Sequence, residues 1–202
     1  MKYKTLPGLF TAIASALKKT STSAELLAPN SFVEVISKLD QRAADQISAF
    51  ADGTITYLAN DVLDGMSSIL FGVFEECANL TLTSLPDSIT SIEERAFTGC
   101  SKLALNSLPN SITTIGNNAF SSCRKLALTS LPSSLTSLGS SAFFGCTGLT
   151  TITFKGTPSS IPSSAFTFCS NLKTINVPWA EGAVANAPWG ATSATINYNY
   201  KG

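Results

Sequence analysis

The sequence predicts a repeat solenoid preceded by a small α-helical module, and two observations support this prediction. Between about residues 54 and 190, phenylalanine and cysteine lie three residues apart and recur every 23 residues. The pairs are Phe74 and Cys77, Phe97 and Cys100, Phe120 and Cys123, Phe143 and Cys146, and Phe166 and Cys169. A fixed period is typical of short units that stack on copies of themselves to complete a core. Residues 1–52 lack this repeat and instead place apolar residues at helical spacing.

The helical module, residues 1–52, is expected to contain two helices. Pro7 is suited to open the first helix, which should end near Lys19, and Asn30 or Ser31 is suited to cap the second. The stretch 30–51 also has the spacing of a coiled-coil seam. Two interpretations therefore stay open: a hairpin that caps the first coil, which we favour, or a module that docks a partner or forms a homo-oligomer.

The opening residues have the outline of a signal peptide, with a charged start, an apolar run and a small-residue exit. Their apolar side chains fall on one helical face, however, which favours an amphipathic helix over an export signal. No run reaches the about 18 apolar residues of a transmembrane helix. We therefore expect no membrane insertion.

The solenoid is predicted to span residues 53–202, with an incomplete first coil. The alternation from Leu80 to Leu85 favours one short strand and Ile89–Ile92 favours a second, while the proline between them turns the corner. Stacking would pair such strands in parallel. The segment leading to Ala96 and Phe97 is predicted to be a single helical turn. From about residue 178 the pattern breaks, and a C-terminal cap is expected there.

The composition disfavours catalysis and binding to nucleic acid. The 202 residues include 13 basic and 13 acidic side chains, so no long-range field attracts a polyanion. Histidine, the commonest general base and metal ligand, is absent. The five cysteines share one repeat position, where parallel Cβ vectors suit core packing better than disulfides. We expect no cofactor, no metal and no enzyme.

Over about residues 54–190 the repeat resembles that of the BspA-like leucine-rich-repeat family. The resemblance lies in the order of its motifs: Leu, Ile-x-Leu/Val-Pro, Ser-Ile/Val, Ile-Gly, Ala-Phe and Cys. The fourth and fifth coils, LTTITF and LKTINVP, match the family's strand best, whereas earlier coils place Leu82, Leu105 and Leu128 one residue early. The run FTAIASALKKTSTSAELLAPNSFVEVISKL looks like a module of phage tail-associated proteins, and the ending ATINYNY resembles members from gut bacteria and their phages. The resemblance implies an adhesive or receptor-binding role at a cell surface, outside the cell or on a virion. It carries over no catalytic residue.

Two groups of residues are candidates for ligand binding. Hydroxyl side chains between the paired Ile or Leu positions would form rows: Thr90, Ser91, Thr113, Thr114, Thr136 and Ser137. These rows can bond a glycan or peptide, or they are solvated strand residues of high β-propensity. Trp179 and Trp189 can stack on sugar rings, or they close the last coil and protect a sheet edge.

From these features we expect a non-enzymatic recognition protein that binds a protein or glycan at a bacterial or phage surface. The alternative is a structural component of a phage tail or other surface assembly, in which the N-terminal helices dock or oligomerise.

Overall fold

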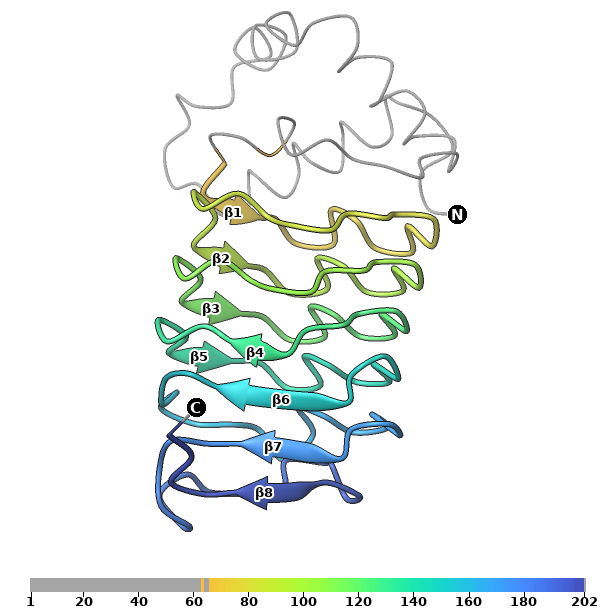
Figure 1. Ribbon diagram of the computed structural model, residues 1–202. Coiled ribbons are helices and arrows are strands. Elements are labelled where there is room, and N and C mark those ends of the chain that lie inside the picture. Colours follow the sequence, from red (N-terminus) through yellow and green to blue (C-terminus); the bar gives the residue numbers. More distant parts are fainter. Residues whose placement is uncertain (1–62, 64–65, 202) are drawn as a thin grey trace, which may run out of the picture.

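The chain forms a solenoid of stacked coils in the computed structural model, which describes Leu63 and residues 66–201 (Figure 1). In these residues, eight short strands form two parallel sheets of four strands each. Sheet A consists of β1 (Ser68–Ile69), β2 (Ser91–Ile92), β3 (Thr114–Ile115) and β5 (Ser137–Leu138). Sheet B consists of β4 (Ser130–Leu131), β6 (Thr151–Phe154), β7 (Thr174–Asn176) and β8 (Thr195–Asn197). The predicted solenoid of 23-residue coils with short parallel strands is confirmed.

The predicted helical module, residues 1–52, lies outside the described residues. The same holds for the stretch 30–51, in which the alternative interpretation places an oligomer interface. Both stay predictions.

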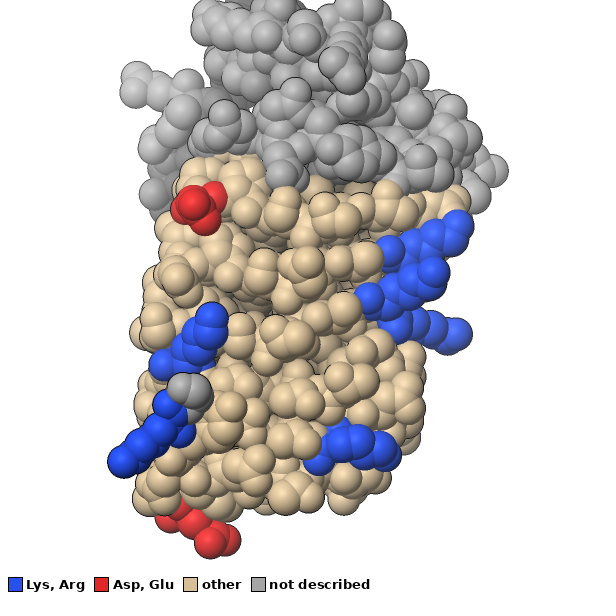
Figure 2. Space-filling model, viewed as in Figure 1, with Lys and Arg blue, Asp and Glu red and all other residues tan. Residues whose placement is uncertain are grey.

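Strand pairing follows the period of the sequence. Ser91 of β2 pairs with Thr114 of β3, and Ile152 of β6 pairs with Ile175 of β7. Equivalent positions of successive coils therefore lie above one another and form ladders along the solenoid axis. Most of the described surface in the view of Figure 2 is uncharged.

Sheet B begins only in the third coil, so the strand predicted from Leu80 to Leu85 is wrong. The structure has no strand there, and the third coil has only the two residues of β4. The buried side chains of Leu82 and Leu85 are three residues apart, and an extended strand cannot point both inward because its side chains alternate. In β6 the buried residues Ile152 and Phe154 are two apart, and a strand forms.

The segment before each core phenylalanine is a run of turns, so the predicted helical turn is also wrong. Ala96 N–H donates within the coil to Glu93 O at 3.2 Å, whereas Phe97 N–H donates to Ala119 O of the next coil at 2.8 Å. Arg95 adopts a left-handed conformation, with φ of 59°, which excludes a helical turn here. The hydrogen bonds between coils take the place of helical ones.

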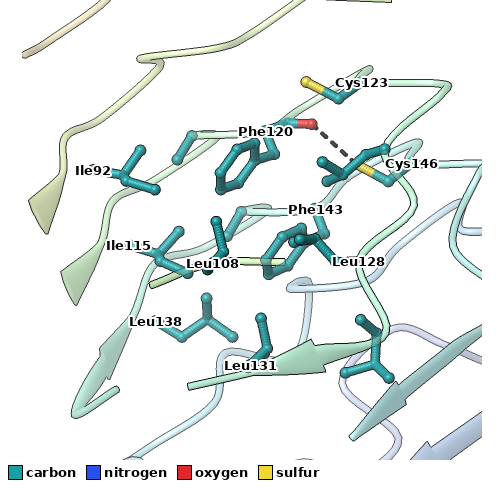
Figure 3. Packing of buried hydrophobic residues seen from close by; sticks show 14 of the residues in the cluster. Ile92, Leu108, Ile115, Phe120, Cys123, Leu128, Leu131, Leu138, Phe143 and Cys146 are labelled. Carbon is teal, nitrogen blue, oxygen red and sulfur yellow. Dashed lines mark hydrogen bonds between the residues drawn. The ribbon is translucent and has the colours of Figure 1, made fainter. Parts of the chain in front are cut away.

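A ladder of stacked phenylalanines forms the centre of the core (Figure 3). Its members are Phe74, Phe97, Phe120, Phe143 and Phe166, with ring centroids 5.2 to 5.5 Å apart. In the view of Figure 3, Phe143 lies between Ile115 on one side and Leu128 on the other. Its side chain, like those of Phe97, Phe120 and Phe166, has no exposed area. The phenylalanine ladder thus packs between the inward-pointing residues on the side of sheet A and those on the side of sheet B.

The five cysteines are free thiols, as predicted. Cys146 Sγ donates to Phe120 O at 3.0 Å, and this bond recurs at the same distance for Cys100, Cys123 and Cys169. Burial raises the pKa of Cys169 to about 11, and burial together with the Glu76 carboxylate raises the pKa of Cys77 to about 12. The thiols are therefore protonated at neutral pH and satisfy carbonyl groups inside the core.

Candidate functional site

The predicted hydroxyl residues form two neighbouring ladders on the side of sheet A. The outer ladder consists of Thr90, Thr113 and Thr136 and is continued by Ser159, and all four residues are exposed. Each hydroxyl donates to the main-chain carbonyl one coil earlier, at 3.0 to 3.2 Å, and the same carbonyl accepts the residue's own N–H. The hydroxyl protons are thus used inside the ladder, and the remaining lone pairs of the hydroxyl oxygens are left as acceptors.

The inner ladder consists of Ser91, Thr114 and Ser137, on β2, β3 and β5. Ser91 Oγ lies 2.8 Å from Ser68 Oγ and 2.9 Å from Glu93 Oε1, and Ser68 donates to the same carboxylate oxygen at 3.1 Å. The hydroxyl of Ser91 is therefore held by its neighbours, whereas Ser137 is exposed to solvent. The structure thus brings the six predicted hydroxyl residues together on one face.

The outer ladder can bind a ligand that supplies hydrogen-bond donors. Its oxygen atoms repeat once per coil, at about the 4.8 Å spacing of neighbouring strands. A ligand with donors at a similar repeat, such as the hydroxyl groups of a glycan or the N–H groups of an extended peptide, can bond several steps at once. Single bonds of this kind are weak, so binding would depend on their number.

Trp179 and Trp189 do not lie on the surface, which corrects their prediction as a sugar-stacking site. Trp189 has no exposed area and its Nε1 donates to Ala185 O at 2.7 Å, while Trp179 is 7% exposed. Both indoles pack with Phe154, at centroid distances of 5.4 and 6.1 Å. A ring without an exposed face cannot stack on a sugar. The two residues complete the core behind the last phenylalanine of the ladder.

A group of surface residues that the prediction missed lies on the turns that follow each Ala-Phe pair. Phe144 and Phe168 contact each other edge to face on these turns, and Lys102, Arg124 and Lys125 lie on the turns of earlier coils. An alignment of the coils shows Phe168 as an exception, because the other coils have Glu, Gly, Ser and Gly at its position. We call these five residues the aromatic-basic edge.

Groups that typically hold metals or act as nucleophiles do not gather in residues 66–201. No three His, Cys, Asp or Glu side chains in this part of the chain are arranged to hold a metal ion. Burial raises the pKa of Cys123 and Cys146 well above the ordinary value for a thiol, so neither forms the reactive thiolate at neutral pH. No helix in the same part is long and apolar enough to cross a membrane.

Similar solved structures are bacterial leucine-rich-repeat proteins. A leucine-rich repeat protein from Bacteroides ovatus is 28% identical with a TM-score of 0.40, and the match covers 54% of this chain and 34% of that one. The leucine-rich repeat protein of T. pallidum is 28% identical with a TM-score of 0.44, over 60% of this chain and 70% of that one. A leucine rich cell surface protein from Faecalibacterium prausnitzii is 23% identical with a TM-score of 0.41, over 52% and 38% of the two chains.

The family of the chain is shown by its repeat and not by these structural matches. The chain spans only about a third of the Bacteroides ovatus protein, and no curated protein matches it. A family model described as "BspA type Leucine rich repeat region" matches residues 67–184 in six copies, which is more than half of the chain. The chain therefore belongs to the BspA-type leucine-rich-repeat family.

Proposed function

We propose that this protein is a non-enzymatic recognition protein that binds a protein or glycan at a bacterial or phage surface, with the outer hydroxyl ladder as its contact surface. BspA-like leucine-rich-repeat proteins are generally protein-interaction modules at surfaces. The observation that favours the ladder is the orientation of its hydroxyls. Thr90, Thr113 and Thr136 are exposed, yet each donates its proton to the preceding coil.

This orientation favours ligands that are rich in donors. A freely rotating hydroxyl can turn its donor or its acceptor side to a ligand and loses that freedom on binding. The three threonines are held in one orientation before any ligand arrives, so less freedom remains to be lost. A glycan hydroxyl or a peptide N–H can then donate to each oxygen.

The test replaces the three threonines together by valine, Thr90→Val, Thr113→Val and Thr136→Val, which keeps the branched shape and removes the oxygen atoms. The matched control replaces the exposed Thr129 and Thr150, which lie on the side of sheet B, by valine. Binding is measured to intact bacteria, to an array of glycans and to extracellular matrix proteins. We expect the triple variant to bind about tenfold more weakly and the control to bind normally. Equal binding by both variants would contradict the proposal.

The alternative, a structural component of a phage tail, depends on residues 1–52 and on homo-oligomers formed through residues 30–51. Light scattering after gel filtration separates the two functions. A stable oligomer that binds none of the probes would favour the structural role, and a monomer that binds a probe would favour recognition.

A further inference from the structure

The aromatic-basic edge presents an aromatic pair that the core does not use. The rings of Phe144 and Phe168 meet edge to face, with centroids 5.0 Å apart and an interplanar angle of 89°. Phe168 is 69% exposed, the largest value among the exposed large hydrophobic side chains of the described residues. Its ring therefore gains little from the hydrophobic effect in the free protein.

The backbone conformation at position 168 makes a phenylalanine there still less favourable for folding. Five successive coils have a left-handed residue at this position: Glu76, Gly99, Ser122, Gly145 and Phe168, with φ values of 62°, 78°, 62°, 67° and 60°. Glycine adopts this conformation without steric cost, whereas a bulky side chain does not. A strained and exposed phenylalanine at a place that glycine fits is typical of a binding site.

Basic residues lie on the corresponding turns of earlier coils. Lys102, Arg124 and Lys125 are exposed, and the only ion pair within residues 66–201 joins Arg95 and Glu75. Figure 2 shows a group of Lys and Arg side chains at one edge of the solenoid. From Ala96 to Lys201 the sequence has the basic residues Lys102, Arg124, Lys125, Lys155, Lys173 and Lys201 and the single acidic residue Glu181. From Ala96 onward basic side chains outnumber acidic ones, although the whole chain is neutral and Glu76 lies on the corresponding turn of the preceding coil.

We propose that the aromatic-basic edge is a docking site for an acidic peptide segment of a partner protein. An apolar side chain of the segment packs on Phe144 and Phe168, and its carboxylates pair with Lys102, Arg124 and Lys125. This surface is separate from the hydroxyl ladder, so it adds a second contact to the function proposed above.

The chemistry of the edge favours a peptide over a sugar or a lipid surface. Phenylalanine lacks the polar group with which tyrosine and tryptophan bond a sugar or a lipid headgroup. Three basic side chains are fewer than the about four to eight that typically bind anionic lipids. Protein interfaces, in contrast, are enriched in aromatic residues and arginine at their centres.

The test uses the full chain and short synthetic peptides in which a central Leu or Phe is flanked by Asp and Glu. Peptides with Lys in place of the acids are the control ligands, and binding is followed by fluorescence anisotropy at low and high salt. The variants are Phe168→Gly and the double change Arg124→Glu with Lys125→Glu. Lys155→Glu, a charge reversal on another turn, is the matched control protein.

We expect the acidic peptides to bind, both edge variants to bind about tenfold more weakly, and Lys155→Glu to bind normally. High salt should weaken the binding, since the charges are exposed. Because glycine suits the backbone at position 168, Phe168→Gly should melt at the same temperature as the wild type or higher. A loss of binding in that variant therefore cannot arise from unfolding.

Three results would overturn the proposal: no binding of acidic peptides, equal binding of acidic and basic peptides, or unchanged affinity in both edge variants. Vesicles of phosphatidylcholine with phosphatidylserine test the lipid surface, and binding to vesicles without binding to peptides would also overturn it. The outcome is independent of the threonine variants, so failure of this site and failure of the hydroxyl ladder can be told apart.

Discussion

Sheets A and B are built from the same repeat, yet they follow it to different extents. Sheet A takes a two-residue strand from each of four successive coils, starting with β1, whereas sheet B starts at β4 and its strands lengthen to four residues in β6. On the side of sheet A the inward residue keeps its place, at Ile69, Ile92, Ile115 and Leu138. On the side of sheet B it moves one place later, from Leu128 to Ile152.

This difference shows that the coils do not need a strand on both sides in order to stack. The second coil has no strand on the side of sheet B, and it is still bonded to the third coil through its turns, as between Phe120 N–H and Ala142 O. The phenylalanine ladder continues through coils of both kinds. Packing along the axis is therefore the constant feature, and strand formation depends on local spacing.

The largest loss of stability is expected from truncating a phenylalanine of the ladder, because the ladder runs through successive coils of the solenoid. Phe120→Ala removes a ring with no exposed area that stacks on Phe97 and Phe143. Leaving this cavity should lower the free energy of unfolding by about 3 to 5 kcal/mol. Chemical denaturation measures the loss. Phe168→Ala, which truncates the same side-chain type at an exposed position, should cost less than about 1 kcal/mol, and similar losses would contradict this account.

A smaller loss is expected from the polar ladder of sheet B. Asn176 is 6% exposed, its Nδ2 donates to Thr153 Oγ1 at 3.0 Å, and it accepts from Asn197 Nδ2 at 2.8 Å. Asn176→Ala removes both hydrogen bonds and a buried side chain, which should cost about 1 to 3 kcal/mol. In sheet A, Thr113→Ala affects an exposed ladder and should cost about 0.5 kcal/mol. Denaturation of both variants tests the contrast, and equal costs would show that burial does not decide it.

The thiol ladder makes stability depend on pH above about 9. Below the ordinary thiol pKa of 9.0 the cysteines are protonated in both the folded and the unfolded chain. At higher pH the unfolded chain loses these protons, whereas burial raises the pKa of Cys169 to about 11 in the folded chain. Stability is therefore lost as the pH rises from about 9 to about 11, by about 1.4 kcal/mol for each thiol at pH 10.

Comparing Cys169→Ala with the wild type isolates one thiol. The variant loses the bond to Phe143 O at every pH, but its stability should fall less steeply above about pH 9. Denaturation midpoints in a pH series measure the two slopes. Parallel curves would mean that the pKa of this thiol is not raised in the folded protein.

The ladders of the core could be predicted from the sequence because each coil repeats its apolar residues at one spacing. The start of sheet B could not, because Leu80 and Leu82 alternate like a strand and only the position of Leu85 breaks the pattern. The outer hydroxyl ladder could be located, but the direction of its bonds depends on carbonyl groups of the preceding coil. Burial of Trp189 is likewise decided by how the last coil folds over the core.

Moving the inward residue of the third coil tests whether the spacing of buried residues decides strand length. Leu128→Thr together with Thr129→Ile reproduces the order of the fourth coil, where Thr151 precedes the buried Ile152. We expect β4 to lengthen toward its N-terminal side, so that positions 128 and 129 pair with Thr151 and Ile152. Because the apolar volume is nearly kept, stability should change by less than about 1.5 kcal/mol.

Hydrogen exchange measured for residues 128–131 reports the new strand as slower exchange at these amides. Leu128→Thr alone is the control, since it removes a buried side chain without supplying another and should cost more than the double change. If the double change costs as much as the single one and leaves exchange unaltered, the position of the inward residue does not decide the length of β4. If it costs little and slows exchange, a one-residue shift of the inward side chain is sufficient to lengthen β4.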